Sequence, residues 1–233
     1  MAQEVVKTRA FKNTVNVKPY AKAYNEEAYV SYCKKHAVSI SFKRFFDVLL
    51  CLPALIILSP ILLLCAVIIK ATSKGPAFYS QERVGRNLKP FNVIKFRTMK
   101  PGSYSTEVAG GEVRKNDSRV TAAGKILRRL KIDELPQIIN VIKGDMSIIG
   151  PRPMLSRHIE SYSKDELSRY YVRPGLSGLT QINGGINLSF EDRAAYDAIY
   201  IKNLSIWLDI KIIIKTFLVI ILGEHKFIKT PKP

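Results

Sequence analysis

The chain has 233 residues, which suits one domain or one domain with appendages. It carries 37 Lys and Arg against 19 Asp and Glu, and the formal net charge of +18 points to an anionic partner: nucleic acid, anionic lipid or phosphorylated small molecules. Its 3 cysteines and 3 histidines are scattered, which excludes a disulfide framework, a zinc site and a histidine metal cluster.

Residues 1–40 form a basic segment with two interpretations. Tyr24, Ala28 and Tyr32 recur at helical spacing, which favours a short amphipathic helix on a membrane surface. A partly disordered tail fits the same composition. Both alternatives stay open, and the role of this segment is not given by its residues.

Residues 41–74 contain a long apolar run. No charged residue lies between Val48 and Ile69, and a helix of about 22 residues would be roughly 33 Å long, enough to cross a bilayer. The run begins far from Met1 and no small-residue cleavage site follows it, which disfavours a secretory signal peptide.

Ser59 and Pro60 interrupt the middle of this run. Proline has no N–H and clashes with the preceding turn, so the helix should kink or break at Pro60, while the Ser59 hydroxyl can satisfy a freed carbonyl. Basic residues flank both ends of the run, which suits a re-entrant hairpin with both ends at the cytoplasmic surface. A kinked spanning anchor explains the same residues, so the topology stays open at this point.

Two extended runs, 77–80 and 91–97, flank a turn-rich segment and predict a small β-hairpin. Side chains alternate along a strand, so Lys95 and Arg97 are expected to share one face of the second strand.

Residues 121–143 predict a helix in two pieces, with Asp133 as the N-cap of the second piece. Asp133 and Glu134 form an acidic pair among basic residues. Carboxylates in such a setting bind a metal or attack a phosphorylated substrate. The alternative is an ordinary N-cap whose salt-bridge partner is Arg129.

Several basic residues are candidates for phosphate binding, because arginine grips phosphate oxygens in bidentate fashion. Arg152 and Arg173 lie in proline-rich turns that would hold them rigidly. Each cation taken singly is also explained as a surface charge or a lipid-headgroup contact. The candidates are Lys95, Arg97, Arg119, Arg128, Arg152 and Arg173.

The last apolar stretch, residues 206–222, is interrupted by charges and predicts an interfacial helix with Trp207 at the headgroup level. Residues 190–202 predict another helix, and residues 223–233 a C-terminal tail. The sequence contains no helix-turn-helix, zinc finger or phosphate-binding glycine loop, so a nucleic-acid partner is not expected.

In combination, these motifs resemble the bacterial sugar transferase family of monotopic polyprenyl-phosphate phosphoglycosyl transferases, from about Ser41 to Leu222. The motifs in chain order are Lys43–Asp47, Ser59–Pro60, Gln81–Gly85, Lys95–Met99, Asp117–Thr121, Asp133–Gln137, Gly144–Ser147, Gly150–Pro153, Arg173–Gly175 and Trp207–Asp209. The resemblance implies a mainly helical α+β protein that is monotopic in the membrane, with interfacial amphipathic helices and a small β-hairpin. It favours the re-entrant helix–break–helix hairpin at 41–74 and a cytoplasmic catalytic domain at 75–222, on the inner membrane of a bacterial cell.

The resemblance also implies a reaction. Sugar 1-phosphate would pass from a UDP-sugar to undecaprenyl phosphate with release of UMP, through a covalent phosphosugar–aspartate intermediate, to begin exopolysaccharide, capsule or O-antigen-type glycan assembly. Asp133 would be the nucleophile, and Glu134 would help hold Mg²⁺ beside it. The phosphate-handling cations of the family match Lys95, Arg128, Arg152 and Arg173. Asp145 matches the Gly-Asp-Met motif with its role left open.

Two departures from the family are expected to matter. Gly185 stands where many relatives carry an arginine, so the effect of that position is open. The chain is also expected to be a minimal form without the multi-span region of longer relatives. The sugar, the glycan pathway and the oligomeric state, a homo-oligomer included, are not given by the residues. The alternative function is a non-catalytic membrane-surface scaffold that binds anionic lipids.

Overall fold

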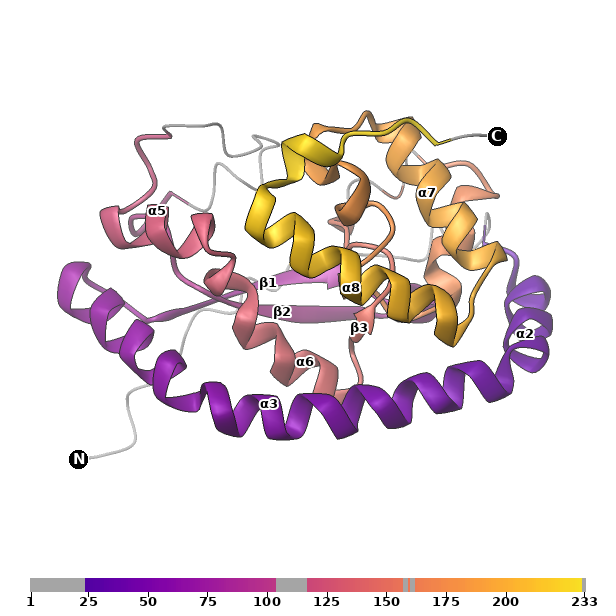
Figure 1. The fold of residues 1–233 in the computed structure, drawn as a ribbon, viewed down its shortest axis with the longest axis horizontal. Coiled ribbons are helices and arrows are strands. Elements are labelled where there is room, and N and C mark those ends of the chain that lie inside the picture. The colour runs from indigo at the N-terminus through magenta and orange to yellow at the C-terminus, as the bar shows by residue number, and fades with distance from the viewer. Residues whose placement is uncertain (1–23, 104–116, 157–158, 160–161, 232–233) are drawn as a thin grey trace.

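The structure, a computed structural model, describes residues 24–103, 117–156, 159 and 162–231. Over these ranges it is mainly helical with two small two-stranded sheets, which confirms the α+β, mainly helical prediction (Figure 1). The predicted N-terminal segment up to residue 23 and the last two residues of the predicted C-terminal tail lie outside the described residues.

Helix α2 (Glu26–Lys35) occupies part of the N-terminal segment. Its N-cap is Asn25, whose side chain accepts a hydrogen bond from the backbone N–H of Ala28 at 2.9 Å. The rings of Tyr29 and Tyr32 pack against Tyr171, with centroids 5.9 and 5.4 Å away. Aromatic contacts therefore hold α2 against the body of the protein.

Helix α3 (Ala37–Thr72) is one continuous helix that contains both Pro53 and Pro60. Of the two outcomes predicted at Pro60, a kink or a break, the structure shows no break in the secondary structure. Pro60 cannot donate to the carbonyl one turn earlier, that of Ile56, but Ser59 Oγ donates to this same carbonyl at 2.7 Å. The serine fills the hydrogen-bond deficit that the proline creates, so the helix continues along a bowed path instead of breaking (Figure 1).

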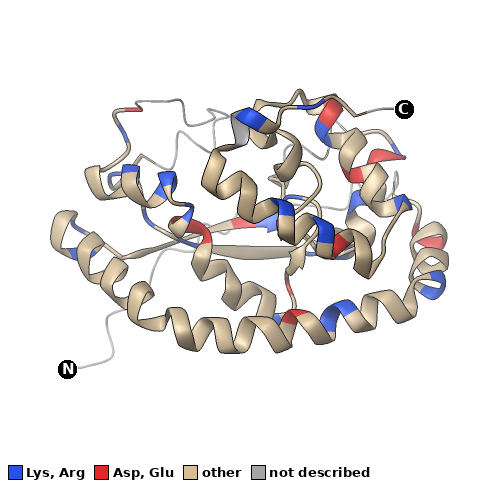
Figure 2. Ribbon diagram, viewed as in Figure 1, with Lys and Arg blue, Asp and Glu red and all other residues tan. Residues whose placement is uncertain are grey.

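The middle of α3 is uncharged and exposed. Figure 2 shows that its Lys, Arg, Asp and Glu residues lie toward its two ends. Ile56 and Ile57 are each 73% exposed, and α3 is the one helix among the described residues that is long and apolar enough to cross a membrane. Such a surface is stable when covered by lipid rather than water, so α3 indicates membrane association.

Polar side chains near the start of α3 attach it to the rest of the protein. The Arg44 guanidinium donates to two carbonyls in the last turn of helix α6 (Ile138–Lys143), at 2.5 and 2.7 Å. The buried Asp47 accepts hydrogen bonds from strand β3 (Ser147–Ile149), from a hydroxyl at 3.0 Å and from a backbone N–H at 2.9 Å. These contacts fix the polar end of α3 against α6 and β3.

The predicted β-hairpin is confirmed. Strands β1 (Phe78–Val84) and β2 (Pro90–Phe96) pair antiparallel and are connected through the 3-10 helix η1 (Arg86–Leu88). Lys95 lies opposite Tyr79 in this register. The hairpin gives Lys95 a rigid base beside the helices that follow.

Strand β3 and strand β4 (Gly175–Ser177) form a short parallel pair that the sequence patterns do not predict. The two backbones approach closely at Gly150 and Gly175, because a Cβ on Gly175 would lie 2.1 Å from the Gly150 nitrogen. Only glycine permits this approach, which brings the two proline-rich turns together.

The predicted two-piece helix is present as α5 (Ala122–Arg129), the 3-10 helix η2 (Ile132–Gln137) and α6. Asp133 lies in the first turn of η2 and is not its N-cap, which corrects the prediction. Lys131 adopts a left-handed conformation, with φ of 57°, and is the N-cap, so η2 begins two residues earlier than an N-cap at Asp133 would give. Gly144, with φ of 93°, ends α6 as expected.

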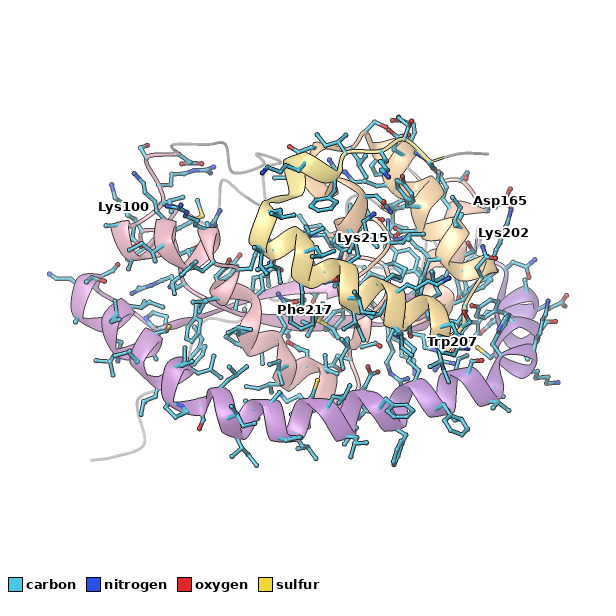
Figure 3. All side chains as sticks on the ribbon, viewed as in Figure 1. Lys100, Asp165, Lys202, Trp207, Lys215 and Phe217 are labelled. Atoms are coloured by element: carbon cyan, nitrogen blue, oxygen red, sulfur yellow. The ribbon has the colours of Figure 1, made fainter. Side chains whose placement is uncertain are left out.

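Helices α7 (Phe190–Lys202) and α8 (Ile206–Leu222) match the two predicted C-terminal helices. Trp207 and Phe217 on α8 are 74% and 64% exposed (Figure 3), which fits the predicted interfacial helix. An ion pair of 2.6 Å between Lys43 Nζ and Asp209 Oδ2 joins α3 to α8. The remaining short 3-10 helices are η4 (Glu166–Tyr171), η5 (Gln181–Asn183), η6 (Gly185–Asn187) and η7 (Glu224–Phe227).

Candidate active site

Glu134 lies between two cations that come from different parts of the fold. Lys95 Nζ, on β2, donates to Glu134 Oε1 at 2.7 Å, and Arg152 Nη2 donates to the same oxygen at 2.9 Å. The packing of β2 on η2 places Lys95, while the turn after β3 places Arg152. Three of the predicted site residues therefore meet at one carboxylate oxygen.

The charged side chains in this cavity shift the pKa values of one another. Burial acts to raise the pKa of Glu134, but Arg152 and Lys95 hold it well below its usual range. Burial lowers the pKa of Lys95, and the positive charges of Arg152 and Arg83 lower it further. The negative charge of Glu134 acts in the opposite direction and raises it. Glu134 is therefore ionised, and the site holds more positive than negative charge.

Asp133 differs from Glu134 in its surroundings. Burial and the neighbouring charge of Glu134 raise its pKa, against the opposing effect of Lys95, Arg128 and Lys131. Its carboxylate accepts no hydrogen bond from the part of the chain that the structure describes. Asp133 is thus a carboxylate near several cations whose oxygens are uncommitted, which suits a nucleophile.

The cavity at this site also contains two residues that sequence reasoning did not assign to it. Arg83 on β1 and the buried Gln137 on η2 line it together with Lys95, Glu134 and Arg152. Each lies within a motif that supports the family resemblance, so the motifs point to the segments that contain them. Within those segments, neither spacing nor residue type shows that Arg83 and Gln137, rather than their neighbours, line the cavity.

Arg128, a predicted phosphate-binding residue, lies near enough to Asp133 for its charge to act on that carboxyl. Its Nε donates to Thr98 Oγ1 at 2.8 Å, which holds the guanidinium beside α5, and its charge lowers the pKa of Asp133.

Four other predicted residues have partners outside the Glu134 cavity. Arg97 is 4% exposed and donates to the carbonyls of residues 73 and 74, so it holds the segment that follows α3. Arg173 Nε donates to a carbonyl at the end of α6 at 2.7 Å and lines a second cavity that also contains Asp47. Arg119 pairs with a neighbouring aspartate at 2.6 Å, and Asp145 accepts from an asparagine amide on α6 at 3.3 Å.

The acidic pair has the donor set for a magnesium ion shared with a phosphate. The described residues contain no group of three or more His, Cys, Asp or Glu side chains placed to hold a metal. Mg²⁺ is usually held by one or two carboxylates together with substrate phosphates and water. Lys95 and Arg152 occupy Glu134 Oε1, whereas Glu134 Oε2 and the Asp133 carboxylate accept no hydrogen bond from described residues. These oxygens fit the ion.

Comparison with known proteins gives one family and several relatives. The profile of the family described as bacterial sugar transferase matches residues 38–223. The chain is 43% identical over 189 residues to the UDP-glucose:undecaprenyl-phosphate glucose-1-phosphate transferase of Klebsiella pneumoniae, an alignment that covers 78% of this chain and 40% of the relative. It is 37% identical over 199 residues to the exopolysaccharide production protein ExoY of Rhizobium meliloti, with 79% and 88% covered.

A third relative is the UDP-N-acetylgalactosamine-undecaprenyl-phosphate N-acetylgalactosaminephosphotransferase of Aeromonas hydrophila. It is 41% identical over 188 residues, with 78% of this chain and 44% of the relative covered. The chain therefore spans less than half of the Klebsiella and Aeromonas relatives and most of the Rhizobium one. The two relatives with a named sugar differ in that sugar, so similarity at this level does not fix it.

Proposed function

This chain belongs to the bacterial sugar transferase family, and on that premise we propose that it transfers a sugar 1-phosphate from a UDP-sugar to undecaprenyl phosphate, releasing UMP. This reaction would begin the assembly of an exopolysaccharide, capsule or O-antigen-type glycan. The observation that carries the proposal is the carboxylate of Asp133, which accepts no hydrogen bond from a described residue and lies next to Glu134, itself held between Lys95 and Arg152.

In the first step, an oxygen of Asp133 attacks the β-phosphorus of the UDP-sugar. The bond from this phosphorus to the oxygen that bridges the two phosphates breaks, and UMP leaves with the electron pair. Lys95, Arg152 and Arg83 provide positive charge around the cavity where the negative phosphates must lie. The product is a phosphosugar joined to Asp133 as an acyl phosphate.

In the second step, a phosphate oxygen of undecaprenyl phosphate attacks the same phosphorus. The bond between phosphorus and the Asp133 oxygen breaks, which restores the carboxylate and leaves the sugar on a diphosphate-linked lipid. Splitting the transfer in this way lets one set of cations serve both displacements.

Glu134 has two roles in this account. Through Oε1 it orients Lys95 and Arg152, and through Oε2 it would hold Mg²⁺ together with Asp133. When bound, the ion neutralises charge on the transferring phosphoryl group.

The pH dependence of the reaction should depend on Arg128. Asp133 must be ionised to attack, so kcat/KM should rise with pH through its raised pKa. The charge of Arg128 lowers that pKa, and the substitution Arg128→Gln should therefore move the acid limb of the profile to higher pH. The exposed neighbour Arg129 provides the control, because Arg129→Gln should leave the limb in place. A profile of UMP release for the three proteins checks this, and an unmoved or acid-shifted limb in Arg128→Gln would contradict it.

We further propose that α3 enters the cytoplasmic face of the bacterial inner membrane and returns to it. The bowed course of α3, the basic residues at both of its ends and the contacts of Arg44 and Asp47 with α6 and β3 support this topology. In a spanning topology, the two ends would lie on opposite sides of the bilayer.

Cysteine labelling tests the topology. Ser41→Cys and Lys74→Cys place thiols at exposed positions before and after the apolar stretch. In intact spheroplasts, an impermeant maleimide should label neither position, and it should label both after permeabilisation. The parent chain, with Cys33 half-buried and Cys51 and Cys65 buried, provides the background. Labelling of one position from outside the cell would show that α3 spans the membrane.

A further inference from the structure

The turn that carries Arg152 is held through its carbonyl groups. Pro151 and Pro153 have no N–H, so the turn has fewer donors than an ordinary one. Four successive carbonyls instead each accept a hydrogen bond. The pairs are Pro151 with Gly175 N at 2.9 Å, Arg152 with Arg169 Nη2 at 2.8 Å, Pro153 with Arg83 Nη1 at 3.4 Å, and Met154 with Val84 N at 3.1 Å.

The donor to the Arg152 carbonyl is part of a buried ion pair. Arg169 Nη2 also lies 2.9 Å from Asp197 Oδ2 on α7, and the two side chains are 3% and 4% exposed. Thr180 Oγ1 donates to the other carboxylate oxygen at 2.9 Å. The guanidinium lies over the rings of Tyr162 and Tyr170, at 4.9 and 5.7 Å from their centroids.

A buried ion pair of this kind is weak evidence for stability. Removing two charges from water costs about as much as their attraction returns, and apolar replacements of similar volume are often no less stable. A guanidinium, however, can serve two partners at once, here through an ion pair with Asp197 and a hydrogen bond to the Arg152 carbonyl. No apolar side chain can make that connection.

We propose that Arg169, fixed by Asp197, is a positioning residue that holds the backbone of Arg152 so that its guanidinium reaches Glu134. The Arg152 side chain is long and 40% exposed, so the position of its backbone determines where its guanidinium can reach. The hydrogen bond from Arg169 to the Arg152 carbonyl fixes that backbone position. This inference rests on the proposed function, in which Arg152 contacts the phosphates.

A double-mutant cycle tests the proposal. Arg169→Lys keeps the charge but loses the planar guanidinium that lies over the two tyrosine rings and sets the position of Nη2. The kcat for UMP release should therefore fall about 10–100-fold, with a smaller change in KM, because misplacement of a catalytic group by about 1 Å has an effect of this size. In an Arg152→Ala background, the same substitution should cause little further loss. Asp197→Asn should behave in the same way.

The ion pair between Lys43 and Asp209 supplies the matched control. Asp209→Asn breaks a partly buried pair that joins α3 to α8 and does not touch the Arg152 turn. Its effect on UMP release should add to that of Arg152→Ala, as expected for independent sites. An additive cycle for Arg169→Lys would overturn the positioning role.

A readout without catalysis separates this inference from the proposed function. Hydrogen exchange followed by mass spectrometry should speed up in the Arg169→Lys protein at the backbone N–H groups that bond in or to the turn, those of Val84, Gly150 and Gly175, and stay unchanged across β2. Unchanged exchange at these three N–H groups, or a uniform increase over the whole chain, would contradict the proposal. If the wild-type protein releases no UMP from any UDP-sugar, the proposed function fails, and the exchange result alone decides whether Arg169 positions the turn.

Discussion

Replacing Asp133 by asparagine is expected to abolish UMP release from the UDP-sugar. The amide has nearly the same shape but no charge, so it cannot form the acyl phosphate through which both displacements pass. Loss of a nucleophile removes most of the rate, and a fall of at least about 10³-fold in kcat is expected. Chromatography of the nucleotide products gives the rate directly.

The control for this substitution is Asp165→Asn. Asp165 is exposed and lies away from the β1–β2 hairpin (Figure 3), so its amide variant should retain the wild-type rate. Substantial UMP release by a folded Asp133→Asn protein would show that another group attacks the phosphorus.

The substitution Glu134→Gln should lower kcat by about 10²–10³-fold, the loss typical of removing one preorganised electrostatic contact. Lys95 and Arg152 would lose their shared negative partner, and the site would lose an oxygen suited to Mg²⁺. The charge of Glu134 raises the pKa of Asp133, so its removal should move the acid limb of the pH profile to lower pH. Because the pKa of Asp133 falls in this variant, protonation of Asp133 does not explain the loss of rate.

The matched control is Glu191→Gln, an exposed residue in the first turn of α7. A Glu134→Gln protein that turns over like this control would remove the dyad from the chemistry. Full pathway function in cells with that variant would favour the alternative, a non-catalytic scaffold that binds anionic lipids at the membrane surface.

Local patterns in the sequence predicted most elements of the fold. Alternation and turn residues predicted the β1–β2 hairpin, and helical patterns predicted α7 and α8. The helix α2 was one of two alternatives for its segment. The cavity residues Lys95, Glu134 and Arg152 were named as candidates from residue type and turn chemistry. These features depend on neighbours a few residues apart, which a sequence displays directly.

Features that depend on distant contacts were not predictable in the same way. The spacing of Lys95 and Arg97 places them on one face of a strand, but Arg97 instead bonds carbonyls just after α3, more than twenty residues earlier in the chain. Arg173 lies in a turn much like that of Arg152, yet its guanidinium bonds the end of α6. Nothing in the local sequence distinguishes these arginines from those in the cavity.

The continuous course of α3 through Pro60 was also not predicted, although it depends on a local contact. Rules for proline predict the loss of a hydrogen bond at this point, and that loss is real. The geometry of Ser59, whose hydroxyl bonds the freed carbonyl of Ile56, decides whether the helix breaks. The sequence shows that the serine is present but not which carbonyl it bonds.

The central claim is that the sugar phosphate passes through Asp133, and a labelling experiment tests it most directly. The protein in detergent is incubated with a panel of UDP-sugars carrying ³²P in the β-phosphate, first without and then with undecaprenyl phosphate. For at least one sugar, label should attach to the protein on a peptide containing Asp133 and move to the lipid when the acceptor is added. Transfer of label to the lipid by a protein that never becomes labelled, at any mixing time, would contradict the account.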